Sequence, residues 1–176
     1  YRDDSELTLF NGTALNEATR ISADFAEVMA LSFEVWEASG YLFDPTVGPL
    51  VNLWGFGPEI SLNDRVPLAA EIQSALSQTG FGSVTLESDE KGFWLIKSLN
   101  VRIDLSGIAK GYAVDIVANH LEMLALTDYL VEIGGEVRVS GNNPKGKPWR
   151  VAIETPQMMG GVERVLELQD SALATS

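Results

Sequence analysis

The sequence predicts an α+β protein in which helices gather against a mainly antiparallel β-sheet, and three observations support this. Apolar residues recur at helical spacing through residues 22–40 and again from residue 108. Two short strand-like segments, residues 83–87 and 93–97, flank Ser-Asp-Glu-Lys-Gly, which is the pattern of a β-hairpin. Alternation of apolar and polar residues at 149–154 fits an antiparallel strand with one face covered by helices.

The elements follow one another without an internal repeat, a low-complexity segment or a linker. In the first part we predict a short helix from Ser5, a helix from the N-cap Ser22 to Gly40, a shaped loop around a brief helix at 41–58, and a helix at 67–78. In the second part we predict a strand at 100–105, a helix from Ile108 to Leu124, strands at 129–140, 149–154 and 162–168, and a turn at 141–148.

Composition narrows the class of protein. With 176 residues, of which 45% are hydrophobic, the chain is long enough to bury a sizeable core. A net charge of −13 argues against binding to nucleic acid, which needs clustered Lys and Arg. No apolar run approaches the roughly 20 residues needed to cross a bilayer. The absence of Cys excludes disulfides, thiolate metal sites and thiol catalysis within this chain.

Residues 101–115 are the most informative stretch, because an apolar strand pattern ends on Asp104 and a glycine-bracketed basic turn then opens a helix. Backbone N–H groups in a first helical turn lack intrahelical partners and carry the positive end of the helix dipole, which suits a phosphate. Lys110 adds a mobile cation and Asp104 a carboxylate. A plain strand-to-helix turn with a solvated lysine fits the same residues, so the pattern by itself leaves both interpretations open.

Three segments that are separated in the sequence carry a resemblance to a known protein family. They are residues 41–58, 101–115 and 129–156, and the last holds Glu-Ile-Gly-Gly-Glu at 132–136. In this order they resemble the ApbE-type flavin transferases, the FAD:protein FMN transferases, and residues 1–11 are similar to the N-terminal segment of that family. The resemblance covers nearly the whole chain and implies an ApbE-like, T-fold-related architecture.

The resemblance implies a magnesium-dependent enzyme that cleaves FAD and attaches FMN through a phosphoester to a Thr or Ser of a partner protein, releasing AMP. The implied acceptors are subunits of membrane redox complexes, and the implied location is the bacterial periplasm, with a lipid anchor to the inner membrane outside this chain. An FAD pyrophosphatase or a non-catalytic FAD-binding module is the alternative. A scaffold or interaction domain also fits the acidity but leaves the three segments unexplained.

The resemblance also implies which residues hold the ligands. Asp104 and Lys110 match FAD-contacting positions, and Gly107 stands where a backbone carbonyl ligates magnesium. Leu42, Phe43 and Asp44 match a segment that lines the FAD site, and Tyr1 matches a position that faces the isoalloxazine. For Phe43 the alternative is a core aromatic, and for Tyr1 it is a frayed terminus.

Other polar residues receive structural interpretations. His120 is expected on the helix surface or at the edge of the core, and Asp115 is taken as structural. Ser106 is a candidate N-cap, whereas Glu132 and Glu136 either approach the ligand from a Gly-Gly turn or are solvated strand ends. Residues 172–176 look like the start of a family segment whose later Asp and Thr supply most of the metal site. Residues 1–176 are therefore expected to be a partial transferase domain without a complete metal site, and no catalytic residue is assigned.

Overall fold

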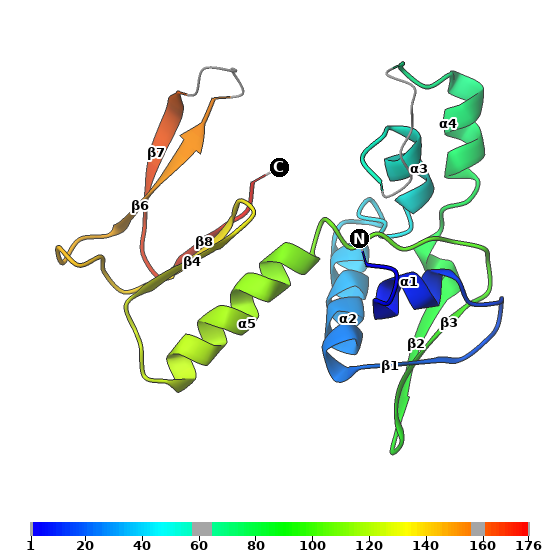
Figure 1. Ribbon diagram of the computed structural model, residues 1–176, viewed down its shortest axis with the longest axis horizontal. Coiled ribbons are helices and arrows are strands. Elements are labelled where there is room, and N and C mark those ends of the chain that lie inside the picture. Colours follow the sequence, from blue (N-terminus) through cyan, green and yellow to red (C-terminus); the bar gives the residue numbers. More distant parts are fainter. Residues whose placement is uncertain (1, 58–64, 156–160, 176) are drawn as a thin grey trace. The chain divides into compact units, whose positions relative to one another are not determined.

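The structure is a computed structural model that describes residues 2–57, 65–155 and 161–175. The chain divides into two compact units, Tyr1–Gly107 and Ile108–Ser176, and Figure 1 shows helices and antiparallel strands in each. Every strand ladder is antiparallel among the described residues, and helices pack on the three-stranded sheet of each unit. The predicted α+β class is therefore confirmed.

In the first unit, two serine caps begin helices where the sequence predicts them. The Ser5 side chain accepts a hydrogen bond from the Thr8 N–H at the start of α1, and the Ser22 side chain accepts one from the Phe25 N–H at the start of α2. The helices of this unit are α1 (Glu6–Asn11), α2 (Ala23–Ala38), α3 (Gly48–Leu53), α4 (Ala69–Leu76) and the 3-10 helix η1 (Phe81–Ser83).

The sheet of the first unit has the strand order β1-β3-β2. Its strands are β1 (Thr19–Ile21), β2 (Val84–Asp89) and β3 (Gly92–Lys97), so the predicted hairpin is confirmed. Helix α2 packs against β2 and β3. Phe81 is fully buried and stacks on Phe33 of α2 with 4.3 Å between the ring centroids, which ties η1 to this helix.

In the second unit, α5 (Ala109–Met123) packs on a sheet of strand order β4-β5-β8. The apolar face of this helix meets the sheet through a buried cluster of Val114, Ala118, Tyr129 and Val131. The strands of this unit are β4 (Tyr129–Ile133), β5 (Glu136–Ser140), β6 (Trp149–Glu154), β7 (Val162–Leu168) and β8 (Ser171–Leu173), and β6 pairs with β7 in a separate ribbon.

Three sequence predictions of local structure are wrong. Residues 100–105 do not form the predicted strand, and within the described part of the chain they make one isolated bridge, a parallel one between Val47 and Arg102. The Ile103 backbone pairs instead with the Asn11 side chain, and the Asp104 N–H with the Pro45 carbonyl. Residues 129–140 are two strands rather than one, since Gly134 and Gly135 take φ angles of +58° and +95° and turn the chain back. Ser106 does not cap α5, which begins after Ile108.

One lysine lies in the core of the first unit. Lys97 is fully buried, its Nζ donates a hydrogen bond to the Asn11 carbonyl at 2.8 Å, and the ammonium stands 5.5 Å from the centroid of the Phe10 ring. Burial lowers the pKa of Lys97 from its ordinary value, because the core disfavours the charged form.

This burial predicts a pH dependence of stability. Between the lowered folded-state pKa and the ordinary value the unfolded chain binds more protons than the folded chain, so stability rises with pH across that interval. We expect the free energy of unfolding of the natural sequence to rise relative to that of Lys97→Met as the pH is raised toward the ordinary pKa of lysine. Urea denaturation at fixed salt measures the free energy of unfolding of the natural sequence and of the variant at each pH. Lys91→Met, at an exposed lysine, is the control. The prediction is contradicted if the stability of the natural sequence relative to Lys97→Met stays constant or falls as the pH rises.

Candidate functional site

In the first unit the structure places two predicted ligand segments side by side. The Asp104 N–H donates a hydrogen bond to the Pro45 carbonyl at 2.7 Å, next to the bridge between Val47 and Arg102. At Gly48 a Cβ atom would stand 2.7 Å from the Arg102 carbonyl oxygen, so only glycine permits this approach. The loop after Leu42 therefore lies along the segment that ends on Asp104.

Phe43 and Gly107 belong to the same neighbourhood. A Cβ atom built on Gly107 would contact the Phe43 ring edge at 3.4 Å. Phe43 is half-buried rather than part of the core, and Leu42 is 88% exposed. These two side chains, and the exposed Gly107, are therefore accessible from solvent, as a ligand contact requires.

Asp44 holds its own loop in shape. Its Oδ1 accepts hydrogen bonds from the Thr46 N–H at 2.7 Å and the Thr46 hydroxyl at 2.5 Å, and its Oδ2 accepts one from the Phe81 N–H at 3.3 Å. Thr46 is fully buried, and its hydroxyl oxygen accepts a hydrogen bond from the Gly80 N–H at 2.7 Å. Asp44 thus joins residues 44–46 to the start of η1, a role that the sequence analysis missed although Asp-Pro-Thr is a turn signal.

Asp104 orders the turn that follows it. Its Oδ1 accepts a hydrogen bond from the Ser106 N–H at 2.8 Å, which bends the chain toward Gly107. The side chain is half-buried. Asp104 also lines a small pocket of about 70 Å³ together with the N-terminal segment, through Asp3, Thr8 and Asn11.

The N-terminal segment is attached to this site by one amide side chain. The Asn11 Nδ2 donates to the Ile103 carbonyl at 2.9 Å, and the Ile103 N–H donates to the Asn11 Oδ1 at 2.8 Å, so the side chain pairs with the backbone as a neighbouring strand does. Asn11 was not among the predicted site residues. Its place at the end of the family-like segment 1–11 was the one signal in the sequence that pointed to it. Tyr1 lies outside the described residues, so its predicted role stays a prediction.

In the second unit Lys110 is held in place, rather than mobile as the sequence suggested. Its Nζ donates a hydrogen bond to the Gly134 carbonyl at 2.9 Å and lies 3.1 Å from the Glu136 Oε1. Glu132 does not contact the lysine but accepts a hydrogen bond from the Gly135 N–H at 2.8 Å. Both glutamates therefore take part in the β4–β5 turn that receives Lys110.

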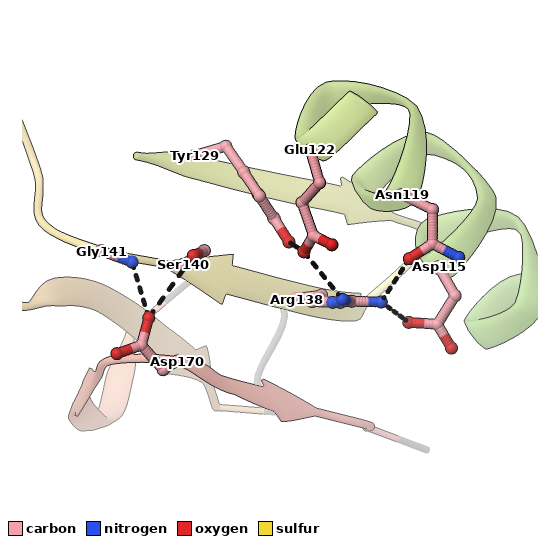
Figure 2. A network of polar contacts seen from close by, with 8 residues as sticks. All are labelled: Asp115, Asn119, Glu122, Tyr129, Arg138, Ser140, Gly141 and Asp170. Atoms are coloured by element: carbon pink, nitrogen blue, oxygen red, sulfur yellow. Dashed lines mark hydrogen bonds and ion pairs between the residues drawn. The ribbon is translucent and has the colours of Figure 1, made fainter. Parts of the chain in front are cut away.

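A second group of polar contacts fixes α5 to β5 further along (Figure 2). Arg138 of β5 donates to Asp115 and Glu122 of α5, each at 2.9 Å, and to Asn119 at 3.2 Å. The hydrogen bond to Asp115 is the main reason why the pKa of Arg138 is raised. Asp115 is thus structural, as predicted. His120 lies exposed on the same helix, also as predicted.

Tyr129 joins this network from β4, and its hydroxyl donates to the Glu122 Oε1 at 2.5 Å. Burial, followed by this hydrogen bond, raises the pKa of Tyr129. Nearby, the Asp170 Oδ1 accepts hydrogen bonds from the Gly141 N–H at 2.8 Å and the Ser140 hydroxyl at 3.4 Å, as Figure 2 shows. The Tyr129 contact thus joins α5 to the sheet, whereas Asp170 joins the turn between β7 and β8 to the end of β5.

The described residues contain no group of three or more His, Asp or Glu side chains that could hold a metal ion. The Gly107 carbonyl is an oxygen ligand of the kind that magnesium accepts, but it is a single donor. Within residues 2–57, 65–155 and 161–175, no helix is long and apolar enough to span a membrane.

The fold and these segments define the class of domain to which the chain belongs, and comparisons with known proteins identify its family. The model of the ApbE family matches residues 1–176, and the chain belongs to that family. The FAD:protein FMN transferase of Haemophilus influenzae is 43% identical over 180 residues, which cover 100% of this chain and 52% of that protein. The one from Vibrio cholerae is 42% identical, with the same coverage. The chain thus spans about half the length of the curated relatives it matches.

Solved structures show the same fold. The flavin transferase ApbE from Vibrio cholerae superposes with a TM-score of 0.86 at 41% identity, over 100% of this chain and 56% of that one. The ApbE protein from Thermotoga maritima superposes with a TM-score of 0.84 at 32% identity and the same coverage. The resemblance and the fold class predicted from sequence are confirmed.

Proposed function

We propose that the whole protein carrying this chain is a flavin transferase that cleaves FAD and attaches FMN to a Thr or Ser of a partner protein, with release of AMP. The observation that carries the proposal is the hydrogen bond from the Asp104 N–H to the Pro45 carbonyl, which aligns two separately predicted FAD segments in the first unit. Relatives named FAD:protein FMN transferase support the same activity.

Proposed FAD contacts occur in each unit, and each unit is considered by itself. In the first unit they are the Leu42–Phe43–Asp44 stretch and the Asp104 carboxylate, which suits a hydroxyl or a ring nitrogen of the ligand. In the second unit the Lys110 ammonium, in the first turn of α5, suits a phosphate oxygen. Orientation of the pyrophosphate by the Lys110 ammonium would help to place its phosphorus for attack by the acceptor hydroxyl.

Magnesium fits the described residues only in part. The Gly107 carbonyl can supply one ligand, and we propose that the remaining ligands lie outside the residues that the structure describes. When bound, the ion supplies neutralisation of the charge that develops on the phosphate oxygens. We further propose that the acceptors are subunits of membrane redox complexes and that the protein works in the bacterial periplasm, attached to the inner membrane by a lipid.

One assay separates the candidate functions. The whole protein is supplied with FAD, magnesium and a Thr-bearing acceptor peptide, and covalent fluorescent flavin on the peptide is measured. Transfer supports the proposal, whereas conversion of FAD to free FMN and AMP without labelled peptide identifies a pyrophosphatase. FAD retained without any product identifies a binding module, and failure to bind FAD overturns all three.

The 176-residue chain alone is expected to bind FAD more weakly than the whole protein and to transfer no FMN. The physical reason is that its described residues offer a single proposed magnesium ligand, so charge developing on the phosphate is not neutralised. Equilibrium binding and the peptide assay on both proteins check this. Robust magnesium-dependent turnover by the shorter chain contradicts it.

A further inference from the structure

The Lys110 ammonium has three N–H donors, and the second unit occupies two of them. One faces the Gly134 carbonyl at 2.9 Å, and another faces the Glu136 Oε1 at 3.1 Å. The Glu136 side chain is 14% exposed and the Lys110 side chain 44%. The carboxylate is therefore sheltered, while the ammonium keeps an accessible side for a third partner.

The β4–β5 turn is shaped to receive this lysine. Gly134 has a φ of +58°, and a Cβ atom there would lie 3.1 Å from the Lys110 Cδ, so the lysine stem packs on the bare glycine. The Glu132 carboxylate accepts a hydrogen bond from the Gly135 N–H and closes the turn without touching Lys110. The turn thus has one glutamate that holds its backbone and another that holds the lysine.

The helix that carries Lys110 is itself fixed to the same hairpin. Arg138 of β5 binds Asp115 and Glu122 of α5, as Figure 2 shows, so the helix cannot slide along the strand without breaking these contacts. Lys110 lies in the first turn of α5, and Glu136 is the first residue of β5. The pair is therefore set by the packing of helix on hairpin rather than by chance contact of two flexible side chains.

We propose that Glu136 is a positioning residue for Lys110: together with the Gly134 carbonyl it fixes the ammonium so that its remaining N–H is presented to an anionic group of the ligand. The identity of that group, a phosphate of FAD, rests on the proposed function. Glu136 itself does not touch the ligand. Its effect on affinity must then pass entirely through Lys110, which a double-mutant cycle can test.

The test uses the whole protein with Glu136→Gln, Lys110→Ala, the double variant, and Glu132→Gln as a matched control on the same turn. FAD affinity is measured by flavin fluorescence at fixed salt. We expect Glu136→Gln to weaken FAD binding about two- to fivefold, the effect of one partly exposed ion pair. Glu132→Gln should change it by less than about 1.5-fold, and Glu136→Gln should have no effect once Lys110 is alanine.

Several results would overturn the inference. They are unchanged or tighter binding in Glu136→Gln, an equal loss in Glu132→Gln, and a loss that persists in the Lys110→Ala background. Thermal unfolding of each variant confirms that the fold is kept, and Glu136→Asp, which keeps the charge on a shorter stem, should recover part of the affinity.

A readout without FAD separates this inference from the proposed function. Acetylation of Lys110 by a limiting amount of acetic anhydride, which transfers an acetyl group to the amine and releases acetate, should be faster in Glu136→Gln and unchanged in Glu132→Gln. Mass spectrometry of the ligand-free protein maps the modified lysine. Equal rates in Glu136→Gln and the natural sequence would show that Glu136 does not hold the lysine. Failure of the natural sequence to bind FAD, with faster acetylation in Glu136→Gln, would instead overturn the proposed function and leave the positioning of Lys110 supported.

Discussion

Asp44→Ala is expected to lower the free energy of unfolding by about 2–4 kcal/mol, because several hydrogen bonds to a charged acceptor are lost together. The carboxylate accepts from the Thr46 N–H, the Thr46 hydroxyl and the Phe81 N–H. Thr46 is fully buried, so its donors cannot turn to water when the carboxylate is removed. Urea denaturation followed by circular dichroism measures the loss.

The matched control is Asp89→Ala. Asp89 also accepts a backbone hydrogen bond two residues on, from the Lys91 N–H, but it lies exposed at the end of β2. Asp89→Ala should lower the free energy of unfolding by less than about 1 kcal/mol, the ordinary range for an exposed site. Asp44→Asn keeps one acceptor oxygen, so its loss of stability should lie between those of Asp44→Ala and Asp89→Ala. An equal cost for Asp44→Ala and Asp89→Ala contradicts the assignment of Asp44 as the tie between its loop and η1.

Lys110→Ala is expected to weaken FAD binding by the whole protein by about 1–3 kcal/mol, the range for losing a charged hydrogen bond. Lys110 lies in the first turn of α5, and its side chain is 44% exposed. Flavin fluorescence titration measures the change, and because each 1.4 kcal/mol is tenfold, the loss is readily resolved.

Lys145→Ala is the control for overall charge, since Lys145 lies exposed in the turn between β5 and β6 of the same unit. The control should leave FAD affinity within about twofold of the natural sequence, as salt screens exposed charges remote from the ligand. Unchanged affinity in Lys110→Ala would assign this lysine to packing of α5 on the β4–β5 turn alone.

Where a structural feature depends on adjacent residues, several signals in the sequence predicted it correctly. Ser22 caps α2 through a hydrogen bond three residues away, and the hairpin around residues 88–92 forms by pairing of adjacent segments. Such features depend on neighbours in the chain, which the sequence displays directly. The three-residue strands β1 and β8 were missed because so short a segment has no readable period.

The contacts that build the candidate site are remote in sequence, and periodicity could not predict them. Thr46 bonds to Gly80, and Lys110 bonds to Gly134, across 34 and 24 positions. The likeness to a family identified Asp44, Asp104 and Lys110 as ligand contacts, and these positions stay predictions. It did not predict that Thr46 would pair with Asp44 or that Glu136 would pair with Lys110, and these contacts are visible only once the chain is folded.

Asn11 and Ile103 pair across 92 positions of the chain. During synthesis the amino end of the first unit therefore emerges long before the backbone that it is to join, and until residue 103 has left the ribosome that end has no partner there. Closing so long a loop costs conformational entropy. The two hydrogen bonds between the Asn11 side chain and the Ile103 backbone help to offset this cost. Attachment of the N-terminal segment is thus a late event in the biogenesis of this unit, and it completes the surroundings of Asp104.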